Sequence, residues 1–221
     1  MDEPTDPPQP RPAPLAAARR YRALAPRLPA GGLDLVEVFA PSSEIEIEIG
    51  FGRGMFLLQR AQAAPASGLL GIEIKDKLAV RVSERLARLG LTGSPRVLAG
   101  DARTILPALR PAHCVARVFM GFPDPWCKKR HARRRLLAAP LLDELARLLR
   151  PAGELFLQTD VEERAEGFLQ ALRDHPAFEV VGDGYCADNP YGARTNREQR
   201  AIEDGLPIFR VLARTVVGAG G

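Results

Sequence analysis

The regular alternation of strand-like and helix-like segments constrains the fold of this chain more than any other feature. Residues 44–49 alternate glutamate with isoleucine, which is typical of a β-strand. Strands are also predicted at 69–74, 96–99, 115–120, 155–159, 178–181 and 207–217, and helices at 55–63, 77–89, 136–149 and 161–173. Strands that alternate with helices at this spacing predict an α/β fold with a doubly wound, parallel sheet.

The chain of 221 residues suits one domain with a full hydrophobic core. Residues 1–18 are rich in proline and alanine and predict a disordered tail, so the single folded domain is expected at 19–221. Residues 182–206 predict an irregular loop. The first residues do not resemble a signal peptide, and no apolar run approaches the roughly 20 residues of a membrane helix. We therefore expect a cytoplasmic protein, monomeric or homodimeric, that makes no membrane contact.

Cysteine usage and charge narrow the possible partners. Cys114, Cys127 and Cys186 lie far apart and form no Cys-x-x-Cys pair, which predicts neither a metal site nor a disulfide framework. The net charge of +4 is only a weak indication of a polyanionic partner. Only four of the 31 basic residues are lysines, so coding bias is a simple explanation for many of the arginines.

A glycine-rich turn follows the first predicted strand. It contains Gly50, Gly52 and Gly54 and comes directly after Glu48 and Ile49. Glycine allows tight turning and close approach of a ligand to the backbone. A dinucleotide fingerprint would need its third glycine at position 55, which is a methionine, so a dehydrogenase is disfavoured. An acid followed by Gly-x-Gly-x-Gly is the pattern of S-adenosylmethionine methyltransferases, and a purely structural turn is the alternative.

Two further acids end the next two predicted strands. Glu73 lies 23 residues after Gly50, a separation at which a carboxylate commonly accepts hydrogen bonds from ribose hydroxyls. A solvated acid at a strand end is the alternative for this residue. Asp101 can accept a bond from an adenine amino group, cap the following helix, or do both. Glu48, Glu73, Asp101 and Asp124 all fall near the carboxyl ends of successive strands, where sheets of this class bind ligands.

A stiff acidic loop is followed by a basic run. Asp124 lies between Pro123 and Pro125, and six of the ten residues at 126–135 are lysine or arginine. Positive charge at the start of the predicted helix 136–149 opposes the helix macrodipole, which indicates a functional reason such as contact with RNA phosphates. A solvated first helical turn is the simpler reading, and Trp126 either stacks on a base or packs the loop.

These motifs together resemble the bacterial tRNA (guanine-N7)-methyltransferase family over roughly residues 43–215. The matching segments are the glycine turn, Gly71-Ile72-Glu73, Phe122-Pro123-Asp124-Pro125-Trp126, the basic run, Gln158-Thr159-Asp160 and Thr195-Asn196-Arg197-Glu198. The resemblance implies a Rossmann-like methyltransferase fold with a mostly parallel seven-stranded sheet and helices on both faces. It also implies methyl transfer from S-adenosyl-L-methionine to N7 of guanosine 46 in the tRNA variable loop.

The resemblance further implies roles for individual residues. Those at its cofactor positions are Glu48, Gly50, Gly52, Gly54, Glu73, Asp101 and Asp124, the last also at its catalytic position. Those at its substrate positions are Lys128, Asp160, Thr195, Asn196, Arg197 and Glu198, and those in its RNA-contacting segment are Arg130, His131, Arg133, Arg134 and Arg135. Arg197 departs from the family pattern, which usually has an aromatic residue there.

The implied chemistry agrees with the residues available. Guanine N7 carries a free lone pair, so its methylation needs no general base, and the sequence contains no evident Ser-His-Asp, Cys-His or metal constellation. Positioning of the reactants is then the main task of the protein. Two other readings remain open. One is a methyltransferase of another RNA or of a small molecule, and the other is a catalytically silent RNA-binding protein.

Overall fold

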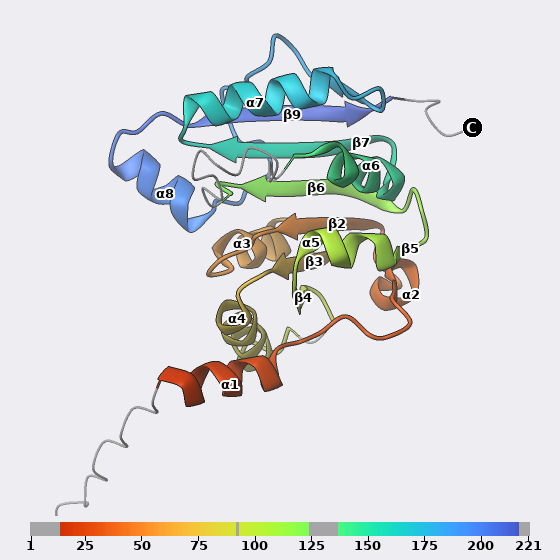
Figure 1. Ribbon diagram of the computed structural model, residues 1–221, viewed down its shortest axis with the longest axis vertical. Coiled ribbons are helices and arrows are strands. Elements are labelled where there is room, and N and C mark those ends of the chain that lie inside the picture. Colours follow the sequence, from red (N-terminus) through yellow and green to blue (C-terminus); the bar gives the residue numbers. More distant parts are fainter. Residues whose placement is uncertain (1–13, 92, 124–136, 217–221) are drawn as a thin grey trace, which may run out of the picture.

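The computed structural model describes residues 14–91, 93–123 and 137–216. Seven strands form one sheet in the order β4-β3-β2-β6-β7-β9-β8 (Figure 1). Their bounds are β2 (Glu44–Ile49), β3 (Ser67–Glu73), β4 (Arg96–Ala99), β6 (Val115–Gly121), β7 (Leu149–Thr159), β8 (Phe178–Val180) and β9 (Phe209–Thr215). β9 is antiparallel to β7 and β8, and the other pairs are parallel. The predicted mostly parallel, seven-stranded sheet is confirmed.

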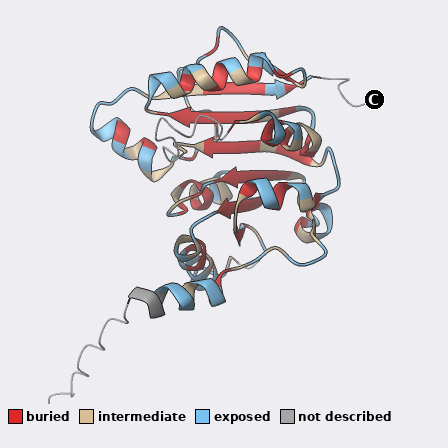
Figure 2. Cartoon of the chain, viewed as in Figure 1, coloured by how far each residue is buried: buried red, intermediate tan, exposed pale blue. Residues whose placement is uncertain are grey.

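Helices cover both faces of this sheet. The helices are α1 (Pro14–Leu24), α2 (Leu35–Phe39), α3 (Met55–Ala63), α4 (Asp76–Arg88), α5 (Ala102–Ile105), α6 (Ala139–Leu148), α7 (Glu162–Arg173) and α8 (Asn196–Glu203), with a 3-10 turn at Leu106–Ala108. A small parallel pair, β1 (Leu33–Asp34) and β5 (Leu109–Arg110), lies beside α2. The strands are largely buried, whereas the outer sides of the helices are exposed (Figure 2).

The alternation within β2 divides the core between the two faces. Ile45, Ile47 and Ile49 pack into the largest apolar cluster, to which α2, α5, α6 and α7 contribute. A second cluster joins α3 and α4 to the opposite face of β3 and β4. Because successive side chains of a strand point to opposite faces, the glutamates of β2 lie on the face away from these isoleucines.

The strand order creates a switch point beside β2. From β2 the chain proceeds outward through β3 to β4, and it then returns to place β6 on the other side of β2. All five parallel strands end at the same edge of the sheet, where α8 also lies (Figure 1). Ligands of doubly wound sheets bind in the crevice outside these strand ends.

The structure corrects the sequence prediction in several places. The segment 182–206 was predicted to be an irregular loop, but it contains the helix α8. β7 begins at Leu149, before the predicted start at 155, and a shift of register against β6 accompanies the longer strand. The tail at residues 1–18 stays a prediction, since residues 1–13 lie outside the described part and α1 begins at Pro14. Within the described ranges, no helix is both long and apolar enough to cross a membrane.

Candidate active site

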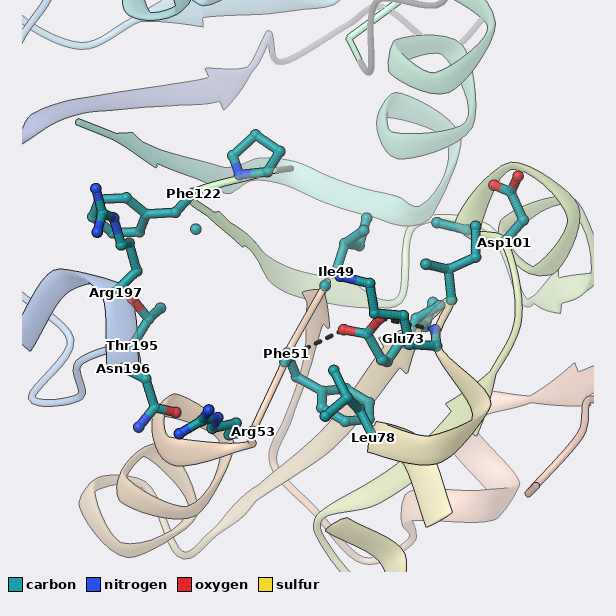
Figure 3. A pocket seen from close by; sticks show the side chains of 18 of the residues that line it. Ile49, Phe51, Arg53, Glu73, Leu78, Asp101, Phe122, Thr195, Asn196 and Arg197 are labelled. Atoms are coloured by element: carbon teal, nitrogen blue, oxygen red, sulfur yellow. Dashed lines mark hydrogen bonds between the residues drawn. The ribbon is translucent and has the colours of Figure 1, made fainter. Parts of the chain in front are cut away.

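A cavity of about 360 Å³ lies at the switch point (Figure 3). This volume is within the usual range for small-molecule sites. Its walls come from the ends of β2, β3, β4 and β6, from the start of α4, and from the N-terminus of α8. The predicted site residues that line it are Gly50, Gly52, Glu73, Asp101, Thr195, Asn196 and Arg197. Residues from five separate chain segments therefore meet in one cavity.

The glycine turn between β2 and α3 has the backbone that its sequence predicts. Gly50, Gly52 and Gly54 have φ values of 78°, 56° and 73°, a region that side chains other than glycine rarely adopt. A Cβ at Gly50 or Gly52 would meet no atom within 4 Å, so open space adjoins the turn. A Cβ at Gly54 would lie 2.9 Å from Val82, so this glycine allows the turn to pack against α4.

Glu73 links this turn to the end of β3. One carboxylate oxygen accepts a bond from the Gly52 N–H at 2.9 Å, and the other accepts one from the Lys75 N–H at 2.9 Å. Only 6% of Glu73 is exposed, and the residue lines the cavity. Each carboxylate oxygen has two lone pairs, so a fixed acceptor remains for ligand hydroxyl groups.

Glu48 is a buried carboxylate next to the cavity wall formed by Ile49 and Gly50. Its Oε2 atom is buried and has no hydrogen-bond partner among the described residues. Burial, together with the negative charge of Glu73, raises the pKa of Glu48 to about 8. Buried polar atoms in folded proteins are nearly always paired, so this oxygen fits a site completed by a donor or a positive charge on a ligand.

Asp101 caps α5. Its Oδ1 accepts the Arg103 N–H at 3.0 Å, and the Arg103 guanidinium contacts both carboxylate oxygens. The hydrogen bond from Arg103 lowers the pKa of Asp101, more than its partial burial raises it. In Figure 3 its carboxylate is directed away from Glu73. The capping role is confirmed, and an adenine contact stays a prediction.

The start of α8 forms the wall opposite Glu73 (Figure 3). Thr195, Asn196 and Arg197 all line the cavity. The Arg197 guanidinium forms an ion pair with Oδ2 of Asp160, which follows the end of β7. Two residues predicted to bind substrate therefore contact each other, although 37 residues separate them in sequence. An aromatic side chain at 197 would not form this pair.

Glu198 has a different position from the other members of its motif. It is fully buried and does not line the cavity. Its carboxylate accepts bonds from Gln158 at 2.8 Å, Asn189 at 3.2 Å and Arg210 at 3.1 Å. Its N–H donates to the Thr195 hydroxyl at 3.0 Å. Glu198 thus anchors the start of α8, and its own contact with substrate stays a prediction. Sequence reasoning missed Asn189 and Arg210, because no local pattern marks them.

The proposed catalytic loop lies outside the described residues. This applies to Asp124, Lys128, Arg130, His131, Arg133, Arg134 and Arg135. Pro123, the last described residue before them, lines the cavity, and its carbonyl accepts a bond from Arg164 at 2.8 Å. Among residues 14–91, 93–123 and 137–216, no group of three His, Cys, Asp or Glu side chains is placed to hold a metal ion.

Together, the sheet order and the cavity at its switch point define a Rossmann-like methyltransferase fold. A 16S rRNA (adenine(1408)-N(1))-methyltransferase from Catenulisporales acidiphilia, solved with SAM as cosubstrate, shares this fold with a TM-score of 0.59. The sequences are 17% identical, and the match covers 89% of this chain and 100% of that one. This likeness establishes the fold.

Sequence comparison identifies the family. A family model described as "Putative methyltransferase" matches residues 42–211. The tRNA (guanine-N(7)-)-methyltransferase of Synechococcus sp. (strain JA-3-3Ab) is 39% identical over 75% of this chain and 70% of its own length. That of Nitrosospira multiformis is 34% identical over 92% of this chain and 90% of its own length. The chain belongs to the tRNA (guanine-N(7)-)-methyltransferase family.

Proposed function

We propose that this enzyme transfers a methyl group from S-adenosyl-L-methionine to N7 of guanosine 46 in the variable loop of tRNA. The observation that carries the proposal is the cavity itself, in which the glycine turn, Glu73 and the start of α8 meet in a member of this family. We expect the reaction to take place in the cytoplasm, where the enzyme meets its tRNA substrate. The proposal applies to a monomer and to a homodimer alike.

The residues around the cavity fit S-adenosylmethionine. Its ribose hydroxyls suit the Glu73 carboxylate, which lines the cavity. Its positive charge suits the unpaired Oε2 of Glu48, which is buried behind the lining residues Ile49 and Gly50. Gly50 and Gly52 leave room for a ligand against the backbone. Asp101 also lines the cavity, so its carboxylate is available to the adenine base of the cofactor. When bound, the cofactor supplies an electrophilic methyl group on a sulfonium.

The chain's own contribution is to orient the guanine. N7 already carries its lone pair, so no side chain has to remove a proton. Asp160, which is paired with the cavity-lining Arg197, would accept bonds from the Watson–Crick edge of guanine. Asp124 would align the base with the methyl donor, and Lys128 with the following arginines would hold phosphate. Correct orientation of reactants is worth several kcal/mol, about 7 or more in the best cases.

Mapping of 7-methylguanosine at nucleotide resolution tests this function. Bulk tRNA and ribosomal RNA are incubated with the protein and S-adenosylmethionine, and we expect the modification at position 46 of tRNA. Methylation of ribosomal RNA alone would refute the proposal. The same outcome would favour a methyltransferase of another RNA. Failure to bind S-adenosylmethionine in calorimetry would favour a catalytically silent protein.

A substitution at Asp124 tests the proposed catalytic residue. Asp124→Ala should reduce the single-turnover rate about 100-fold or more, because the base is no longer aligned. Asp143→Ala is the matched control, since this aspartate lies in α6 with a side chain 67% exposed and should keep the wild-type rate. A near-wild-type rate for a folded Asp124→Ala protein would contradict the assignment.

A further inference from the structure

A basic groove runs along the outer side of α4, next to the cavity. Six lysine or arginine residues and one acid, Glu84, line it. It shares Arg53, Lys75 and Leu78 with the wall of the cavity, so the groove begins where the cavity ends. From this arrangement we propose that α4 is an RNA-binding surface of its own, which holds the phosphate backbone of the tRNA while the target base enters the cavity. This inference rests on the proposed function.

The basic residues of α4 form a single stripe. Lys77, Arg81, Arg85 and Arg88 follow one another at intervals of four, four and three residues, and all four are exposed. Residues at these intervals lie on one face of a helix, and at 1.5 Å per residue the stripe is about 16 Å long. The opposite face of α4 is buried in the core, so the stripe cannot turn inward.

Carboxylates do not neutralise this stripe within the described structure. Arg53, Lys77, Arg81 and Arg85 form no ion pair with a described acid, whereas Asp76 at the start of the same helix pairs with Arg27. Lys77 lies over the ring of Tyr21, at 6.0 Å from its centroid, which leaves its charge in place. The groove therefore presents several positive charges to solvent.

Local helix energetics do not explain Lys77 and Arg81. Arg85 and Arg88 lie in the last turn, where positive charge is favoured by the helix macrodipole. Lys77 lies in the first turn, where positive charge is disfavoured, and Arg81 follows it by four residues as a like charge. A local arrangement that opposes the helix indicates a role outside it.

Phosphodiester backbone is the ligand that best suits this groove. Arginine and lysine bind phosphate oxygens, and a row of them at the rim of a nucleic-acid site tracks the backbone without reading its sequence. The groove is continuous with the cavity in which the base is modified. A partner of another class, such as an acidic protein, would not need this continuity.

The test is a double charge reversal in the full chain, Lys77→Glu with Arg81→Glu. The matched control is Arg96→Glu with Arg110→Glu, two exposed arginines that line neither the cavity nor the groove: Arg96 begins β4 and Arg110 ends β5. Binding to unmodified tRNA is measured between 50 and 200 mM salt, and S-adenosylmethionine binding by calorimetry. We expect the tRNA dissociation constant of the α4 variant to rise about tenfold or more. Its slope against log salt should fall by roughly 1.4 to 1.8, for two lost phosphate contacts.

The expected result also requires unchanged cofactor affinity in the α4 variant and near-wild-type tRNA binding in the control. Wild-type tRNA affinity and salt slope in the α4 variant would overturn the inference, and so would an equal loss in the control. In both cases continued methylation of tRNA leaves the proposed function intact. If the reversal impairs folding, Lys77→Gln with Arg81→Gln replaces it, with a smaller rise of about threefold as the supporting result and no rise as the opposing one.

Discussion

The arginines of the central sheet and those of α4 differ in their partners. In the sheet, Glu46, Arg117, Glu154 and Arg214 lie side by side on β2, β6, β7 and β9 as a row of alternating charge, here called the charge ladder. Glu46 is fully buried and accepts bonds from Arg60 at 2.7 Å and from Arg117 at 2.8 Å. Among the described residues, the only acid that lines the groove along the basic stripe of α4 is Glu84.

This contrast shows that partners, and not composition, decide what an arginine does. Burial lowers the pKa of Arg117, but hydrogen bonds to Glu44 and Glu46 more than offset burial and raise the pKa above its ordinary value. The same bond from Arg117 lowers the pKa of Glu44. The charges of the ladder therefore have partners within the sheet, whereas the stripe on α4 forms no ion pair with a described acid. A net charge of +4 averages over both settings.

The largest effect is expected at Glu48, whose buried oxygen lacks the partners that Glu46 has. Its folded pKa of about 8 lies above the ordinary glutamate value of about 4.5, so stability is lost as pH rises from 4.5 through 8. Glu48→Gln should remove this loss, which is on the order of 5 kcal/mol once the pH exceeds 8. Urea unfolding from pH 4 to pH 9 measures the difference, which should grow with pH. The variant should also bind S-adenosylmethionine more weakly.

If the difference in unfolding free energy between the wild type and Glu48→Gln did not change with pH, Glu48 would not be unpaired as described. Glu46→Gln is the matched control, because its carboxylate is equally buried but held by two arginines. This control should destabilise the protein at neutral pH, the opposite direction from Glu48→Gln.

The next effect concerns Arg117, which is the centre of the charge ladder. Arg117→Met should lower the free energy of unfolding by about 3 kcal/mol, because it leaves buried Glu46 without one of its two cations. Arg81→Met makes the same replacement on α4 and should change the free energy of unfolding by less than about 0.5 kcal/mol. Denaturant titration at pH 7 measures both. Equal losses of unfolding free energy in Arg117→Met and Arg81→Met would contradict the distinction between the charge ladder and the basic stripe of α4.

The smallest effect is expected at the outer end of the ladder. Arg214 contacts Glu154 at 2.9 Å, but its side chain is 51% exposed. Arg214→Gln should cost less than about 0.5 kcal/mol, since exposed ion pairs contribute little. Comparing this loss of unfolding free energy with that of Arg117→Met in the same titration shows how strongly burial affects the contribution of each arginine in the ladder. A loss as large as that of Arg117→Met would mean that position in the ladder, and not burial, sets the contribution.

Local sequence patterns predicted part of the fold with the correct boundaries. The strands at 44–49 and 96–99 and the helix at 55–63 are confirmed. α8 was missed because its exposed face is strongly polar and it buries only Glu198 and Ala201, so it lacks an apolar stripe. β7 was predicted too short because it continues through Pro151 and Gly153, which usually end regular structure.

The candidate site also has features that local sequence patterns predicted and features that only the structure shows. By itself the sequence determined the glycine turn and the acids at strand ends, because turn chemistry and two-residue alternation act over a few neighbouring residues. Only the tertiary structure decided that Arg197 pairs with Asp160, that Glu198 is an anchor inside the protein, and that Glu48 has an unpaired oxygen. Partners and burial of this kind depend on segments far apart in the chain, which the folded sheet brings together.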